Sequence, residues 1–201
     1  MSGIYFKIKT KTTYMFLTEF YSFTLLLEGD LDKILDCHSP ILLQRCTNLI
    51  NSGMPNNEYY IVEKGILRSY VSNNEDKQIT LDFFLKGDLC FDVSAFMLQH
   101  PANIKIIAET DCTLWKVKHV DFVNLFLSIP QFAEWGRQWM TKQLIIAKNR
   151  QMSFMAQDAS MRYRQLMIEY PEVLANVAQK HIATYLGITN TSLSRLRRMK
   201  Y

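Results

Sequence analysis

The sequence lacks the motifs that usually mark an enzyme or a metal protein. Its cysteines form no Cys-x-x-Cys pair, so they build neither a zinc knuckle nor an N-terminal iron–sulfur motif. It also lacks a nucleophile motif, a metal-ligand spacing and a glycine-rich phosphate loop. We therefore predict a protein that is not an enzyme, holds no metal and keeps reduced cysteines in the cytoplasm. The cysteines are Cys37, Cys46, Cys90 and Cys112.

A long hydrophobic run is also missing. The apolar stretch at residues 14–27 follows three lysines, a layout that resembles a signal peptide. Glu19 interrupts the stretch, no small-residue cleavage site follows, and it is too short to span a bilayer. We predict no membrane association, and an amphipathic helix or an irregular lead-in for residues 1–30.

Acidic residues are absent after Glu172. The net charge of the chain is +4, and five cations after Glu172 leave −1 for the first 172 residues. A basic end of this kind is typical of phosphate binding. The five cations are Lys180, Arg195, Arg197, Arg198 and Lys200.

The rest of the composition is that of a globular protein, with 48% hydrophobic and 21% charged residues. Short β-favouring runs lie between residues 31 and 118, separated by Gly, Asn and Asp, and residues 73–76 form a polar hairpin tip. This spacing predicts an antiparallel barrel or jelly roll. The runs are residues 41–43, 59–62, 67–71, 79–84, 104–108 and 113–117.

Helices are predicted after residue 118. Residues 120–127 form a short helix, and Pro130 opens a long one over residues 131–155. Asp158 is the expected N-cap of the next helix, residues 161–169. An apolar stripe on the long helix has two interpretations, burial against the chain's own barrel or a dimerisation seam with a second copy. The stripe is Phe132, Trp135, Trp139 and Ile146.

Two short helices joined by a turn at Gly187 are predicted for residues 179–201. Thr189 is a good N-cap, because its hydroxyl can accept a bond from an unpaired N–H of the second helix. At about 100° per residue, Leu193 and Leu196 share one side of that helix. These leucines are expected to dock on three residues of the first helix, Ile182, Ala183 and Leu186.

Polar side chains occupy the opposite side of the second helix, as in a helix-turn-helix that reads DNA. Arginine can bond guanine, asparagine can bond adenine, and serine or threonine can bond bases or phosphates. The alternative is a solvated amphipathic helix with ordinary surface charges. The predicted DNA contacts are Gln179, Thr189, Asn190, Thr191, Ser192, Ser194, Arg195, Arg197 and Arg198.

This order of elements resembles the Crp/Fnr family of bacterial transcription regulators, over about residues 35–201. Its more specific parts are residues 59–65, 86–88 and 179–198, and residues 182–189 with 192–195 resemble Bacteroidetes-type members. The resemblance implies an α+β chain with a cyclic-nucleotide-binding-like β-barrel (a double-stranded jelly roll), a long dimerisation helix and a C-terminal helix-turn-helix. By position, Asn190, Thr191 and Arg195 occupy the base-reading places.

The chain departs from the cyclic-AMP-binding members at two places. Their Gly-Glu-Leu segment, which holds the ribose, is replaced by Phe91, Asp92 and Val93. Their Arg-Ser or Arg-Thr pair, which holds the phosphate, is replaced by Ala102 and Asn103, so the bidentate arginine contact is lost. We predict no cyclic AMP binding, no identified cofactor, and an unknown effector or none. The candidate effector pocket is Phe91, Asp92, Val93 and Asn103.

The resemblance divides the chain into a lead-in (1–30), a sensor barrel (31–130), a connecting helix (131–156) and a DNA-binding domain (157–201). The family's β-hairpin wing is predicted to be absent or truncated. The expected partners are double-stranded DNA, a second copy of the chain and RNA polymerase. The alternative function is a ligand-binding or scaffold protein whose C-terminal helices bind protein.

Overall fold

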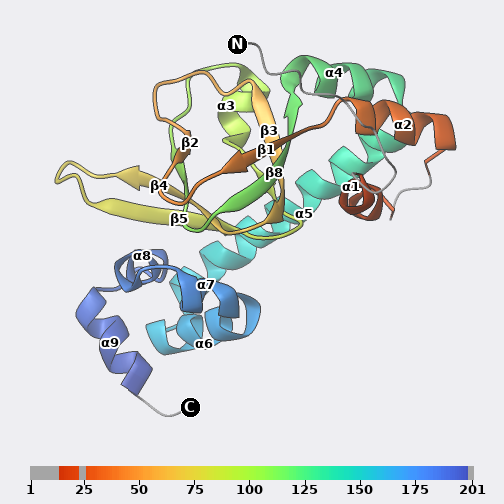
Figure 1. Ribbon diagram of the computed structural model, residues 1–201. Coiled ribbons are helices and arrows are strands. Elements are labelled where there is room, and N and C mark those ends of the chain that lie inside the picture. The colour runs from red at the N-terminus through yellow and green to blue at the C-terminus, as the bar shows by residue number, and fades with distance from the viewer. Residues whose placement is uncertain (1–13, 23–25, 199–201) are drawn as a thin grey trace.

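The strand-rich part of the chain is a sandwich of two antiparallel sheets (Figure 1). The computed structural model describes residues 14–22 and 26–198. One sheet has the order β1-β8-β3-β6 and the other β2-β7-β4-β5. The strands are β1 (Ser39–Leu43), β2 (Asn48–Ile50), β3 (Glu58–Lys64), β4 (Leu67–Ser72), β5 (Gln78–Phe84), β6 (Leu89–Cys90), β7 (Lys105–Ala108) and β8 (Cys112–Lys118).

The predicted closed barrel is wrong, because the strands of the described chain do not close into one ring. The edge strand β6 is only two residues long and pairs with β3 alone, at Tyr60 and Ile61. The opposite edge of that sheet is β1, which pairs only with β8. Two packed sheets are the result.

Local signals in the sequence are confirmed in the strands. The predicted hairpin tip joins β4 to β5, and the side chain of Asn73 accepts hydrogen bonds from the N–H groups of Glu75 and Lys77. Gly65 ends β3 with φ +98°, and a Cβ there would lie 2.5 Å from the carbonyl oxygen of Asp111. The turn therefore requires glycine for both its conformation and its close approach.

Helices surround the sandwich at both ends. They are α1 (Met15–Phe20), α2 (Glu28–Asp36), α3 (Val93–Leu98), α4 (His119–Ser128), α5 (Pro130–Ala156), α6 (Ala159–Glu169), α7 (Pro171–Asn176), α8 (Gln179–Tyr185) and α9 (Asn190–Arg198). Pro130 lies in the first turn of α5, and Asp158 caps α6 by accepting a bond from the N–H of Met161, both as predicted. Helix α5 leads away from the sandwich to the C-terminal helical unit, residues 159–198 (Figure 1).

The N-terminal helices pack on the sandwich through a buried polar chain. The hydroxyl of Tyr21 lies 3.2 Å from Nε2 of His38 and 3.4 Å from the hydroxyl of Tyr59. Burial lowers the pKa of His38 to about 4, so the ring is neutral at neutral pH. The predicted helical lead-in is therefore present as α1, while residues 1–13 of that prediction lie outside the described residues.

Within residues 14–22 and 26–198, none of the helices has the length and apolar character needed to span a membrane. No group of three His, Cys, Asp or Glu side chains is arranged there to hold a metal ion.

Candidate nucleic-acid interface and effector region

Helices α8 and α9 form the predicted pair around Gly187. The hydroxyl of Thr189 accepts a hydrogen bond from the N–H of Ser192 at 3.1 Å, which confirms the predicted N-cap. Leu193 is buried and Leu196 packs on the same cluster as Ile182 of α8. Gly187 has φ +68°, so a residue with a side chain would be strained there.

The opposite side of α9 faces solvent. Asn190, Thr191 and Arg195 are exposed, and so are Arg197 and Arg198. Ser192 and Ser194 are half-buried. The first turn of α9 carries no acidic residue, and its last turn carries three arginines. Asn190, Thr191 and the three arginines therefore give α9 an accessible, positively charged surface, while Lys200 lies outside the described residues.

Asp92, a residue of the candidate effector pocket, is occupied by contacts within the chain. One carboxylate oxygen accepts bonds from the N–H groups of Ser94 and Ala95 at the start of α3, and the other accepts from the N–H of Asn103 at 2.9 Å. Burial raises the pKa of Asp92, but these hydrogen bonds outweigh it and hold the pKa below its usual value. Asp92 thus fixes the segment between α3 and β7 as an ionised cap.

Aromatic rings fill the interior beside Asp92. Phe91 stacks on Trp139 of α5 with ring centroids 5.5 Å apart, and Phe96 meets Phe91 edge-on at 5.2 Å. The cavity that Phe91 lines has a volume of about 20 Å³, which suits about one water molecule. Of the other predicted pocket residues, Val93 is 46% exposed and points away from this interior. A nucleotide does not fit here without rearrangement of the rings.

The predicted dimerisation stripe lies mainly on the side of α5 that packs against the chain itself. Phe132 and Trp135 are 1% and 4% exposed and belong to the sandwich core, which corrects their assignment to a dimer seam. Trp139 packs on the same core, and only Ile146, 44% exposed, is largely free. A different stripe of exposed apolar residues follows the other side of α5. Its members are Met140, Leu144, Ile145, Met152 and Met155.

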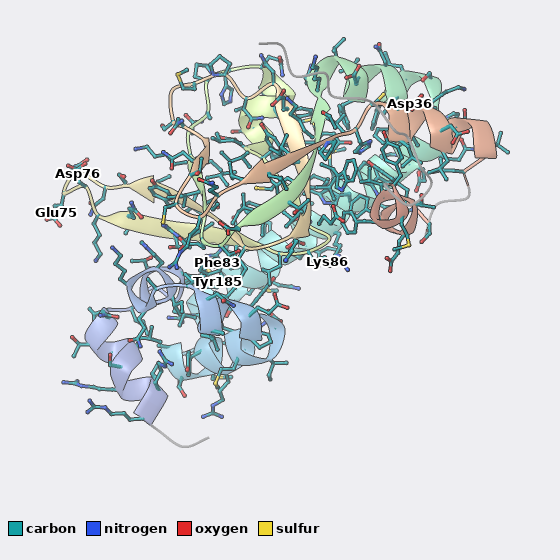
Figure 2. All side chains as sticks on the ribbon, viewed as in Figure 1. Asp36, Glu75, Asp76, Phe83, Lys86 and Tyr185 are labelled. Atoms are coloured by element: carbon teal, nitrogen blue, oxygen red, sulfur yellow. The ribbon has the colours of Figure 1, made fainter. Side chains whose placement is uncertain are left out.

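The C-terminal helical unit is docked on the sandwich, a contact that the sequence did not reveal. The N–H of Thr80 in β5 donates to the hydroxyl of Thr184 in α8 at 3.2 Å. Phe83 of β5 and the ring of Tyr185 lie 4.9 Å apart between the two parts (Figure 2). Ile66 and Phe83 join the hydrophobic core of the helical unit. Long-range pairing of this kind leaves no periodic signal in the sequence.

A buried arginine supports this docking. Arg68 of β4 is 1% exposed, pairs with Glu109 and donates to the side chain of Gln78 at 2.9 Å. Its guanidinium also lies 3.4 Å from Nε2 of His181 in α8. Burial and then the charge of Arg68 lower the pKa of His181 to about 4, so the docked ring is neutral at neutral pH.

The sandwich is similar to a known family of domains. Residues 42–128 match the family model of the cyclic nucleotide-binding domain. A cAMP-dependent protein kinase regulatory subunit from Eremothecium gossypii is 30% identical over 95 residues, a match covering 43% of this chain and 18% of the relative. Residues 42–128 are therefore similar to cyclic nucleotide-binding domains, and the chain spans less than a fifth of that relative.

Solved structures extend the likeness beyond residues 42–128. FixK2 from Bradyrhizobium japonicum superposes with a TM-score of 0.68 and 19% identity, covering 80% of this chain and 82% of that one. CLP from Xanthomonas campestris, a c-di-GMP-responsive global regulator, gives 0.67 and 16%, covering 84% and 88%. A Eubacterium rectale protein assigned to the crp/fnr family of transcriptional regulators gives 0.67 and 19%, covering 86% and 82%. At these identities the likeness shows the fold, which is that of Crp/Fnr-type regulators.

Proposed function

We propose that the chain is a sequence-specific DNA-binding transcription regulator of the Crp/Fnr type. The observation that carries the proposal is the exposed polar face of α9, with Asn190, Thr191 and Arg195 on it and Leu193 buried behind it. A helix presented in this way can enter a major groove, where arginine and asparagine read guanine and adenine. The folds of FixK2 and CLP support the proposal, and residues 182–189 support a Bacteroidetes-type member.

The decisive experiment measures binding to DNA. Selection from random duplexes is expected to return a two-fold symmetric site with half-sites about one helical turn apart. Arg195→Ala should cost about 1–3 kcal/mol and relax the preference at one base pair. Arg197→Ala is the matched control, since a phosphate contact should weaken all sequences alike and reduce the salt dependence. Binding without any sequence preference, unchanged in Arg195→Ala, would contradict the proposal.

Docking of the C-terminal helices on a protein partner is the competing function, and salt distinguishes the two. Phosphate contacts release counterions, so the affinity for DNA is expected to fall steeply as salt rises. The absence of measurable DNA binding at low salt would favour the competing function.

The regulator is proposed to act as a dimer through the exposed stripe of α5 defined above. Three of its members, Met140, Leu144 and Met155, fall within about 60° of one another around the helix axis. Leu144 is 60% exposed, so Leu144→Glu should leave the fold intact but separate the protomers. Light scattering on the purified variant measures the change, with Leu127→Glu, at an 80% exposed site outside α5, as the control.

Cyclic AMP is not expected to act on this chain. The rings of Phe91 and Trp139 occupy the interior, and Asp92 is bound to backbone N–H groups. Neither Ala102 nor Asn103 supplies a cation for a cyclic phosphate. Saturating cyclic AMP should leave both the melting temperature and the affinity for DNA unchanged.

A further inference from the structure

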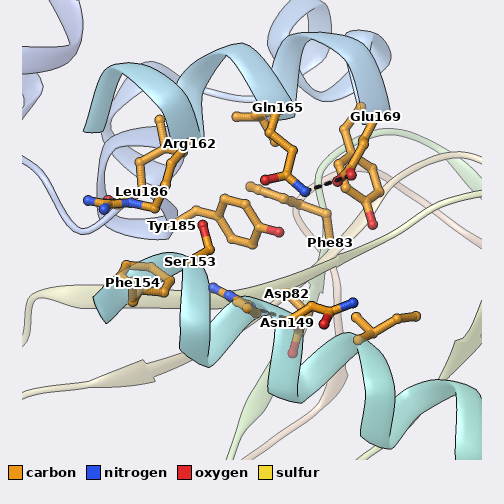
Figure 3. A pocket seen from close by; sticks show the side chains of 14 residues that line it. Asp82, Phe83, Asn149, Ser153, Phe154, Arg162, Gln165, Glu169, Tyr185 and Leu186 are labelled. Carbon is orange, nitrogen blue, oxygen red and sulfur yellow. Dashed lines mark hydrogen bonds and ion pairs between the residues drawn. The ribbon is translucent and has the colours of Figure 1, made fainter. Parts of the chain in front are cut away.

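A space at the junction of the sandwich and the helical unit lies apart from the candidate effector pocket. It is a cavity of about 470 Å³ between strand β5, helices α5 and α6, and the end of α8 (Figure 3). This volume is within the usual range for small-molecule sites. Its walls come from the sensor sandwich, the connecting helix and the helical unit together. A molecule bound here would contact all three.

The floor of this junction cavity is apolar and aromatic. Phe83 and Tyr185 lie side by side there, with Leu166 and Leu186 beside them. The guanidinium of Arg150 lies 4.2 Å from the centroid of the Tyr185 ring and pairs with Asp82 at 2.7 Å. The charge of Arg150 is therefore balanced, and the floor offers flat surfaces for a planar ring.

Helix α6 lines one side of the junction cavity with a cation, an amide and a carboxylate. Arg162, Gln165 and Glu169 are spaced three and four residues apart, so they share one face of the helix over about 10 Å. The amide of Gln165 donates to Glu169 at 2.8 Å. This side of the cavity is thus positive at the Arg162 end and negative at the Glu169 end.

Arg162 has donors to spare at the positive end. Three of its N–H groups donate to backbone carbonyls, one to Gln157 and two to Leu186. Arginine carries five N–H donors, so two remain. Within residues 14–22 and 26–198, Arg162 forms no ion pair with a carboxylate. On this side of the cavity, the positive charge of Arg162 is the one that an anionic ligand group would complement.

Helix α5 lines the side of the cavity that faces α6, and this side of the helix would stay accessible in a dimer. Asn149 and Ser153 project into the junction cavity from this side. At about 100° per residue, the cavity side of α5 lies opposite the exposed stripe of Met140, Leu144 and Met155. Dimerisation through that stripe would leave the junction cavity open.

We propose that the junction cavity binds a small planar aromatic carboxylate, with its ring on Phe83 and Tyr185 and its carboxylate on Arg162. A hydrogen-bond donor at the far end of the ligand would meet Glu169. The proposal deepens the proposed function, on which its regulatory part rests, because such a ligand would be the effector. A ligand that contacts all three walls favours the arrangement in which the helical unit is docked on the sandwich. Such a preference for one arrangement is required if the ligand is to affect DNA binding by α9.

Calorimetric titration of the full chain with indole-3-acetate tests the site in the absence of DNA. The ring N–H and the carboxylate of this probe lie toward opposite ends, and indole-3-acetamide is its neutral counterpart. The amide is expected to bind about tenfold more weakly, because it loses a charge-assisted contact. Equal affinity for acid and amide, or no binding of the acid up to about 1 mM, would overturn the proposal.

Matched variants test whether the carboxylate of the probe binds at Arg162. Arg162→Gln is expected to lose about tenfold in affinity for the acid and nothing for the amide. Arg164→Gln, an exposed arginine on the same helix and outside the cavity, should bind both probes as the unaltered chain does. Circular dichroism establishes that each variant is folded. If Arg162→Gln does not fold, the comparison of acid and amide on the unaltered chain still decides the matter.

A separate measurement tests the regulatory part. The affinity for the selected DNA site should change at least about fivefold when indole-3-acetate is added. Binding of the probe with no effect on DNA affinity would overturn the effector role and leave the site. Failure of the chain to bind any DNA would contradict the proposed function, and the calorimetric result would stand apart from it.

Discussion

The sandwich interior around Phe91 and the junction cavity are both lined with aromatic rings, yet they hold very different amounts of space. The interior leaves about 20 Å³ and the junction about 470 Å³. In the interior, Phe91, Phe96 and Trp139 pack against one another and against other apolar groups, and Phe96 also meets the ring of His119. At the junction, charged groups such as Arg162 need water or a polar partner and keep the space open. The interior around Phe91 therefore serves packing, whereas the junction cavity stays open.

The largest expected effect concerns the tightly packed interior around Phe91. Phe96→Ala should lower the free energy of unfolding by about 3–5 kcal/mol, because the ring is fully buried and meets Tyr59, Phe91 and Phe122. Urea unfolding measures it, with Leu98→Ala, 73% exposed on the same helix, expected within about 0.5 kcal/mol of the unaltered chain. A small loss in Phe96→Ala would mean that the interior is loosely packed and able to open.

Two histidines with lowered pKa values, the buried His38 and the half-buried His181, sharpen the comparison through pH. The pKa of His38 is lowered to about 4 in the folded chain by burial, against an ordinary value of 6.5. The unfolded chain therefore takes up a proton first as pH falls, and the stability is lost between about pH 6.5 and 4. Between pH 7 and pH 5 the loss attributable to His38 should be about 2 kcal/mol.

Substitution separates the contributions of these histidines. His38→Gln should remove most of that pH-dependent loss, as measured by urea unfolding at both pH values. His181, at the junction, has the same direction of shift but lies partly exposed, so His181→Gln should remove less. A larger effect for His181 than for His38 would show that the junction, not the interior, is the drier region.

The smallest expected effect concerns the turn beside the junction. Gly187→Ala should cost about 1–2 kcal/mol, since φ is +68° and a Cβ would lie 2.9 Å from the ring of Phe154. Gly53→Ala is the control, because φ is +83° there and nothing lies within 4 Å of the added Cβ. Equal losses in the two variants would mean that Phe154 moves away freely and that only the backbone conformation matters.

Much of the candidate DNA interface was predictable because its signals are local. The cap at Thr189, the turn at Gly187 and the buried Leu193 each depend on residues within one or two helical turns. The exposed stripe of α5 was not predictable in the same way. Ile145 and Ile146 are adjacent and apolar on different sides of α5, so periodicity alone offers two faces and does not say which one the chain buries.

The sequence by itself determined six of the eight described strands, the helices α4, α5, α6, α8 and α9, the caps and turns, and the basic face of α9. Only the tertiary structure decided that the two sheets stay open, that Phe91 and Trp139 fill the interior, and that the helical unit docks on β5. Caps and turns depend on near neighbours in the chain, whereas the contact between Thr80 and Thr184 joins residues 104 positions apart. Such contacts form only once packing of the whole chain has offset the entropy of bringing distant segments together.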